Sequence, residues 1–127
     1  MHILKARTHG YLDYAAILFL FLMPSLFDLT GTPASLAYGL AIGYVALVAL
    51  TAYPLGLFKL IPFSIHGAIE FALAIGLAAA PWMFRFVGEP VARNLYVALG
   101  AILFVVWLVT DYRTAADSSL HRTAAHH

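Results

Sequence analysis

Four long apolar stretches, separated by short segments rich in polar residues, proline or glycine, make up most of this chain. They cover residues 9–27, 34–53, 62–84 and 91–110, with ends placed to within a few residues. A helix needs about 20 apolar residues to cross the hydrocarbon core of a bilayer, and each stretch meets that length. The pattern therefore predicts four transmembrane helices.

Residues that begin or end helices flank these stretches. Thr8 precedes the first stretch and Ser64 stands at the start of the third, so we expect both to act as N-terminal caps. Pro33 suits the first turn of the second helix. Pro24 and Pro81 lie near the ends of the first and third stretches, where we expect them to kink or end the helices.

Composition supports a membrane location. Of the 127 residues, 63% are hydrophobic and 10% are charged, and the mean hydropathy is +0.89. A soluble domain is about 25% charged. The lipid bilayer is therefore the expected surrounding. The net charge of +1 gives no reason to expect a nucleic-acid partner, and the absence of cysteine excludes disulfides and thiolate metal sites.

The chain resembles itself at a shift of 57 residues, since residues 9–14 recur in similar form as residues 66–71. Without gaps, the identical pairs include His9/His66, Gly10/Gly67, Pro24/Pro81, Gly31/Gly88, Pro33/Pro90 and Gly43/Gly100. Two repeats, about 8–55 and 65–112, would each contain two helices and enter the membrane in the same direction. The expected fold is thus a single all-α domain, a membrane four-helix bundle built from two parallel helical hairpins.

The cationic residues indicate how the bundle is oriented. One side would hold both termini and the residues Lys5, Arg7, Lys59, Arg113 and Arg122, whereas the other side would hold Arg85 and Arg93. Cytoplasmic loops carry the excess of Lys and Arg. We therefore expect a multi-pass protein of the cell (inner) membrane with both termini cytoplasmic, and residues 113–127 as a polar cytoplasmic tail.

The candidate chemistry lies in a polar layer at the cytoplasmic end. His9 and Asp13 are four residues apart, as are His66 and Glu70, so each pair occupies one helix face. If the first and third helices face each other, two imidazoles and two carboxylates meet. That donor set suits Zn, Fe or Mn. Haem held by the two histidines is a second possible cofactor, and Asp111 is a possible further member of the layer.

A purely structural role is the alternative, in which the same side chains pair and hold the first and third helices together. A proton relay across the membrane is not favoured, because residues 15–23 and 72–80 are apolar throughout. There is no phosphate-binding loop and no nucleophile elbow, so we expect no catalytic residues.

Two further features concern the surface of the bundle. Gly39 and Gly43 form a small-residue face that would allow close helix contact, either inside the bundle or in a homo-oligomer. Trp82 and Tyr96 are expected to lie at the membrane interface as aromatic anchors.

The chain resembles the SPW repeat family of small bacterial four-helix membrane proteins over residues 8–113. The resemblance rests on residues 8–14, on Tyr53-Pro54-Leu55-Gly56 and on residues 61–66. The Ser-Pro-Trp tripeptide of the family reads Met23-Pro24-Ser25 in the first repeat and Ala80-Pro81-Trp82 in the second. Thr51-Ala52-Tyr53 and Thr110-Asp111-Tyr112 stand at the repeat ends, where the family has Thr-Asp-Tyr. The resemblance implies a fold and no particular activity.

The sequence favours a non-enzymatic accessory or interaction subunit of another membrane protein, with the polar layer holding the bundle together. The alternative is a metal- or haem-binding membrane redox protein that uses His9, Asp13, His66 and Glu70.

Overall fold

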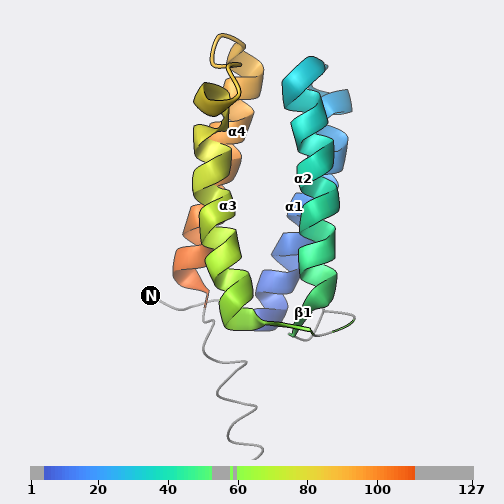
Figure 1. Cartoon of the computed structure of the whole chain (residues 1–127), viewed down its shortest axis with the longest axis vertical. Coiled ribbons are helices and arrows are strands. Elements are labelled where there is room, and N and C mark those ends of the chain that lie inside the picture. The colour runs from blue at the N-terminus through green and yellow to red at the C-terminus, as the bar shows by residue number, and fades with distance from the viewer. Residues whose placement is uncertain (1–4, 53–57, 59, 111–127) are drawn as a thin grey trace, which may run out of the picture.

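The computed structural model describes residues 5–52, 58 and 60–110, apart from the side chains of residues 6 and 52. Within these ranges the chain forms four helices, α1 (Ala6–Leu26), α2 (Gly31–Leu50), α3 (Phe63–Met83) and α4 (Pro90–Val109). They pack against one another as an all-α bundle (Figure 1). All four are long and apolar enough to cross a membrane. The prediction of four long apolar helices is confirmed.

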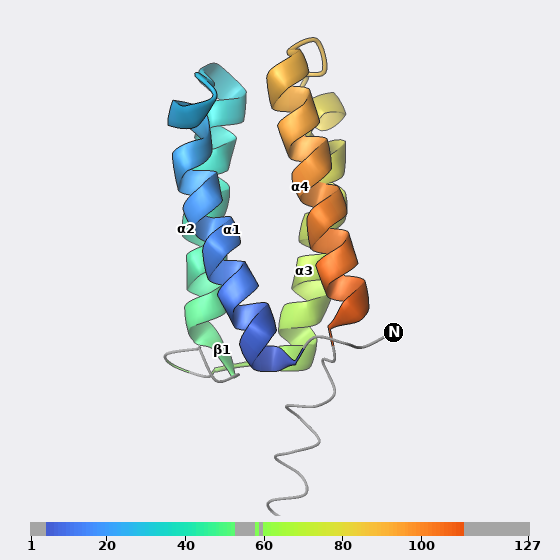
Figure 2. The same ribbon diagram turned by 180° about the vertical axis from the view of Figure 1, so that it is seen from behind.

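The helices are arranged as two hairpins. α1 packs along α2, α3 packs along α4, and far fewer contacts join the two hairpins. α1 and α3 begin at the same end of the bundle, where α2 and α4 finish, and the two hairpin loops lie at the opposite end (Figures 1 and 2). This arrangement brings the first turns of α1 and α3 together.

A short parallel pairing joins the end of α2 to the start of α3. It consists of β1 (Thr51–Ala52) and β2 (Ile61–Pro62), with Thr51 opposite Ile61. The pairing holds Thr51 beside the first turns of α3. Most of the connection between the two strands, residues 53–57 and 59, lies outside the described residues.

Two predicted caps are wrong. α1 begins after Lys5, so Thr8 lies within its first turn, and α3 begins after Pro62, so Ser64 is an exposed helical residue. Neither helix has a side-chain cap hydrogen bond. Pro62 instead fixes an extended backbone immediately before α3, with φ −59° and ψ 145°.

The predicted positions of the other prolines are confirmed. Pro33 lies in the first turn of α2, as predicted, and Pro24 and Pro81 lie in the last turns of α1 and α3. Each of these two helices ends two residues after its proline, at Leu26 and Met83.

The helices α2 and α4 do not align when the two repeats are matched without a gap. α1 and α3 begin 57 residues apart, whereas α2 and α4 begin 59 residues apart, because the loop over residues 84–89 is two residues longer than that over 27–30. Gly43 is exposed and Gly100 is buried, so the ungapped pairing is wrong for these helices. A shift of 59 instead pairs Thr51 with Thr110, and each directly follows its helix.

Tyr96 is a core residue, and its predicted role as an interface anchor is wrong. Its side chain is fully buried against Phe86, with ring centroids 5.0 Å apart, and its hydroxyl donates a 2.6 Å hydrogen bond to the backbone carbonyl of Pro33. Burial of a phenol is favourable where the hydroxyl finds such a partner. Tyr96 thus ties α4 to α2 near the loop end of the bundle, while Trp82 is exposed on the outside of α3.

Gly100 sets the spacing of α3 and α4. A Cβ added at Gly100 would lie 2.6 Å from the backbone nitrogen of Ala78 and 2.7 Å from the carbonyl oxygen of Ala74, whereas one added at Gly43 would meet nothing within 4 Å. We expect Gly100→Ala to lower the stability of detergent-purified protein by about 1–3 kcal/mol, because the helices must separate. Gly43→Ala should raise it by up to about 1 kcal/mol. Thermal unfolding followed by circular dichroism measures both, and equal effects of the two changes would contradict the close approach.

Candidate metal centre

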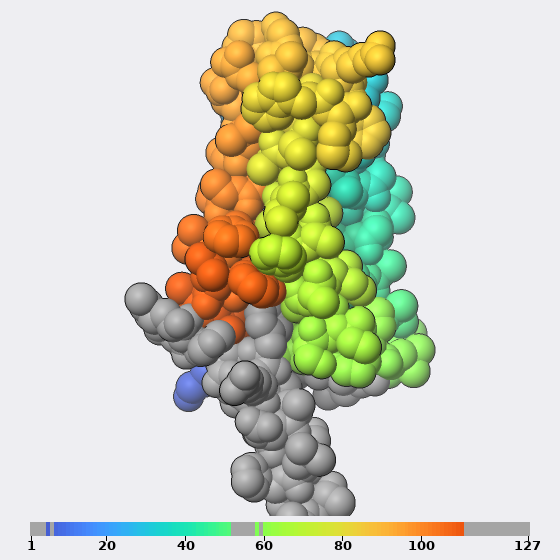
Figure 3. All heavy atoms as spheres, turned by 60° about the vertical axis from the view of Figure 1, so that its left-hand side comes forward, coloured from blue at the N-terminus to red at the C-terminus, as the bar shows by residue number. Residues whose placement is uncertain are grey.

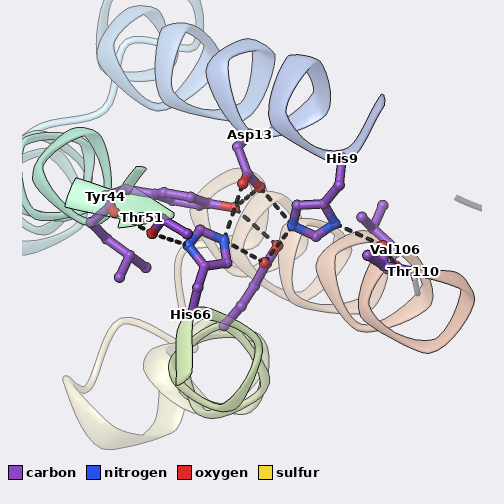
Figure 4. A network of polar contacts seen from close by, with 9 residues as sticks. His9, Asp13, Tyr44, Thr51, His66, Val106 and Thr110 are labelled. Atoms are coloured by element: carbon purple, nitrogen blue, oxygen red, sulfur yellow. Dashed lines mark hydrogen bonds and ion pairs between the residues drawn. The ribbon is translucent and has the colours of Figure 1, made fainter. Parts of the chain in front are cut away.

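Two histidines and two carboxylates form one cluster between the first turns of α1 and α3. His9 and Asp13 come from α1, and His66 and Glu70 come from α3 (Figure 4). No more than 1% of any of these side chains is exposed. Each residue offers one ligand atom, and the four atoms lie within 4.8 Å of one another. Two pairs 57 residues apart in sequence therefore share one buried site.

The carboxylates lie between the two imidazoles. His9 Nε2 is 2.6 Å from Glu70 Oε2 and 3.2 Å from Asp13 Oδ1. His66 Nε2 is 3.1 Å from Asp13 Oδ2 and 3.1 Å from Glu70 Oε2. Each carboxylate thus contacts the histidine of its own helix and that of the other helix. The cluster is the main polar link between the two hairpins.

The other ring nitrogen of each histidine contacts a threonine of the opposite hairpin. His9 Nδ1 is 2.7 Å from Thr110 Oγ1, and His66 Nδ1 is 2.7 Å from Thr51 Oγ1. Each threonine hydroxyl donates its single proton to a helix carbonyl, at Val106 or Leu47, over 2.6 Å. The hydroxyl oxygen can then only accept from the imidazole. Nδ1 therefore carries a proton in both histidines.

Both Nε2 atoms consequently face the carboxylates, and a neutral imidazole would present a lone pair to them. Two lone pairs at these distances repel, so positive charge must lie between each Nε2 and the carboxylate oxygens. Protons on both Nε2 atoms supply it, and so does one divalent metal ion bound to two neutral imidazoles. Either arrangement balances the two carboxylates, as burial away from water requires.

Tyr44 of α2 orients the carboxylates. Its hydroxyl lies 2.6 Å from Asp13 Oδ1 and 3.1 Å from Glu70 Oε1, and its ring is buried. Glu70 Oε2 faces both histidines, whereas Asp13 contacts His66 through Oδ2 and contacts His9 through Oδ1, the oxygen that Tyr44 also contacts. In the described part of the chain no buried side-chain nitrogen or oxygen lacks a hydrogen-bond partner.

The cluster supplies the ligand atoms for a small divalent ion, and these atoms must shift to bind it, since their separations range up to 4.8 Å. Zinc binds nitrogen and oxygen at about 2.0–2.2 Å, which places tetrahedral ligand atoms about 3.3 Å apart. The distances from His66 Nε2 to Asp13 Oδ2 and to Glu70 Oε2, both 3.1 Å, approach that value. His9 Nε2 lies 3.2 Å from the other oxygen of Asp13, Oδ1. His9 Nε2 and Glu70 Oε2, now 2.6 Å apart, must separate by about 0.7 Å.

Haem fits poorly. The two imidazole centroids lie 5.6 Å apart, and oxygens of Asp13 and Glu70 occupy the space between the two Nε2 atoms. A porphyrin held by both histidines would have to pass through that space. The geometry therefore favours a bare metal ion over haem.

Three residues of the site were missed by reasoning from the sequence. Thr51 and Thr110 could have been found, because each ends an apolar helix and begins a Thr-x-Tyr sequence. Tyr44 carries the only hydroxyl in the second half of α2, a weaker signal. Asp111, a predicted possible member of the layer, lies outside the described residues.

Comparison with other proteins adds no assignment. No protein-family model matches the chain, and no match is found among the curated proteins or the solved structures.

Proposed function

We propose that this chain is a multi-pass membrane protein that binds one divalent transition-metal ion at His9, Asp13, His66 and Glu70. Membrane insertion is supported by the large apolar side chains on the outside of all four helices, such as Leu18, Leu26, Ile42 and Ile102, each about 60% exposed. Contiguous apolar surface of this kind drives association in water but is stable in lipid.

The arrangement of the hairpins supports two narrower proposals. Their equal helix lengths, 21 and 20 residues in each, and the crossed threonine contacts support an origin by parallel duplication, as in the SPW repeat family. In the sequence, five Lys and Arg residues precede α1 or α3, begin α1 or follow α4, and only Arg85 and Arg93 lie near the α3–α4 loop, which supports a cytoplasmic location for both termini in a bacterial inner membrane.

The hydrogen bonds from both Nδ1 atoms to threonine carry the metal proposal. Histidines that bind metal almost always donate the other ring N–H to an oxygen, which fixes the tautomer and aims the ligand nitrogen. Here the two threonines do this for both rings at the same distance, 2.7 Å. Two imidazoles and two carboxylates suit Zn, Fe or Mn.

The four ligands also suggest what the ion would do. Four protein ligands complete a tetrahedral shell, as in structural zinc sites, and hydrolytic sites keep one position open for water. We therefore propose a structural ion or, with iron or manganese, a one-electron centre, and no catalytic residues. No reaction is assigned.

An accessory or interaction subunit without metal is the second candidate. This candidate is favoured because the side chains of the cluster are paired with one another. Two added protons, one on each Nε2, are enough to make the cluster neutral. Gly39 and Gly43 support an interaction role, because a Cβ added at either meets nothing within 4 Å. That small-residue face would then contact a membrane-protein partner or another copy.

Substitution of the threonines separates the two candidates. Thr51→Val and Thr110→Val remove the oxygens that accept from Nδ1 while keeping the side-chain shape. We expect each to weaken metal binding about 10–100-fold, as measured by competition with a chromophoric chelator, because the ligand rings lose their orientation. Thr→Ser at either position retains the hydroxyl and should bind metal nearly as the wild type does. Equal affinity of the valine, serine and wild-type proteins would show that the threonines do not orient the ligands, and wild-type protein that binds no metal would leave the metal-free candidate as the better account.

A further inference from the structure

An apolar groove of about 380 Å³ runs between α2 and α3 on the outside of the bundle. Leu36 and Leu40 form the α2 wall, and Ala72, Gly76 and Ala80 lie along the α3 wall. In Figure 3, α3 faces the viewer with α2 behind it at one edge, and the surface of α3 is narrow along its middle. The volume is within the range of small-molecule sites.

The opposite side of the bundle is filled. The cavity between α1 and α4 has a volume of only about 50 Å³. At the shift of 57 that relates α3 to α1, Gly76 corresponds to Phe19 and Ala80 to Met23. Phe19 packs against the core on its side, whereas a Cβ added at Gly76 meets nothing within 4 Å. Gly76 thus leaves open space in the α3 wall of the groove, at the position where α1 carries the larger Phe19.

The charged residue that follows the first helix of each hairpin, at the loop end of the bundle, also differs between the two hairpins. Next to the groove residues Met83 and Phe84 stands Arg85, which is exposed and forms no hydrogen bond or ion pair with any residue that the structure describes. Its counterpart after α1 is Asp28, and both have a left-handed backbone, with φ 61° and 53°. Arg85 thus directly follows the α3 wall of the groove, whereas Asp28 follows α1 and both Glu89 and Arg93 lie at the start of α4.

We propose that the groove binds one acyl chain of an anionic phospholipid, with Arg85 at the phosphate. This site rests on the membrane insertion proposed above. The walls are apolar, so they suit methylenes and offer nothing to a headgroup. An exposed arginine at the membrane surface attracts anionic lipid.

Native mass spectrometry of delipidated protein in detergent tests this site. The probes are phosphatidylglycerol and phosphatidylcholine with identical palmitoyl and oleoyl chains. Wild-type protein should bind one phosphatidylglycerol preferentially. Gly76→Phe should weaken that binding about tenfold or more, since excluding two methylenes from an apolar site has about that effect. Gly43→Phe, at an exposed glycine of α2 that does not line the groove, should bind as the wild type does.

Arg85→Gln tests the headgroup contact. It should abolish the preference for phosphatidylglycerol while the binding of phosphatidylcholine persists. Equal binding by wild-type and Gly76→Phe protein would overturn the site, and so would equal loss in Gly76→Phe and Gly43→Phe or an unchanged preference in Arg85→Gln. Extraction from membranes by alkaline carbonate without detergent would overturn membrane insertion itself. Metal content, measured in the same samples, should not change with Gly76→Phe.

Discussion

Glu70→Gln is expected to abolish metal binding and to lower the free energy of unfolding by about 3–5 kcal/mol. Glu70 contacts His9, His66 and Tyr44, the same three residues that Asp13 contacts. A neutral amide of the same shape cannot balance a metal ion or two protonated imidazoles. The change therefore leaves uncompensated charge in a fully buried site, which is among the costliest single substitutions.

Metal analysis and thermal unfolding in detergent check both parts of this expectation. Glu89→Gln is the matched control, because Glu89 is exposed and lies outside the cluster. It should leave metal content unchanged and stability within about 0.5 kcal/mol of wild type. If Glu70→Gln keeps its metal, the ligand set is wrong. If it also unfolds as the wild type does, the cluster does not hold the hairpins together.

Metal binding should release about two protons for each ion, so that the apparent affinity falls about 100-fold for each unit by which the pH is lowered. The reason is the charge balance of the cluster, in which one divalent ion replaces the protons on His9 Nε2 and His66 Nε2. The cluster that holds both protons and the cluster that holds the ion are both neutral. The pH therefore acts only on the exchange of the two protons for the ion. The weakening on acidification applies over the range in which the metal-free cluster holds both protons.

Calorimetric titration with Zn²⁺ in buffers of different ionisation enthalpy counts the protons directly. His66→Gln removes one of the two exchanging nitrogens, so any residual binding in that variant should release about one proton fewer. An affinity that does not change with pH, or release of no protons by wild-type protein, would contradict the proposed exchange.

The sequence predicted the four helices well because their signal is strong and local. Each stretch of about 20 apolar residues has no other stable form in lipid than a helix. The helix starts were harder, since Thr8 and Ser64 look like caps but lie inside helices that begin earlier. Cap preferences are worth only about 1 kcal/mol, and tertiary packing overrides them.

The repeat was predicted from identities, and those identities misled at the second helices. Gly43 and Gly100 match at a shift of 57, yet the second loop is two residues longer and the helices align at 59. Apolar helices share composition, so chance identities are common in them. Helix bounds and burial reveal the gap, which the sequence alone does not.

The four candidate ligand residues could be predicted from the sequence, but the hydroxyl residues that hydrogen-bond to them could not. A histidine and a carboxylate four residues apart in an apolar helix are conspicuous, and their recurrence implied a meeting point. Thr51, Thr110 and Tyr44 are different, because hydroxyls are common in membrane helices and often bond to their own backbone. Only the three-dimensional arrangement shows that the threonines accept from the histidines of the opposite hairpin.

The central claim is a buried metal ion, and metal stoichiometry tests it most directly. Protein purified in detergent, then incubated with Zn²⁺, Fe²⁺ or Mn²⁺ and desalted, is analysed for metal by mass spectrometry. X-ray absorption reports the ligand distances in the same sample. We predict one ion per chain, bound by nitrogen and oxygen at about 2.0–2.2 Å, and its loss in a His9→Ala, His66→Ala double variant. Folded wild-type protein that retains no stoichiometric metal would contradict the claim and establish the cluster as a metal-free polar link between the hairpins.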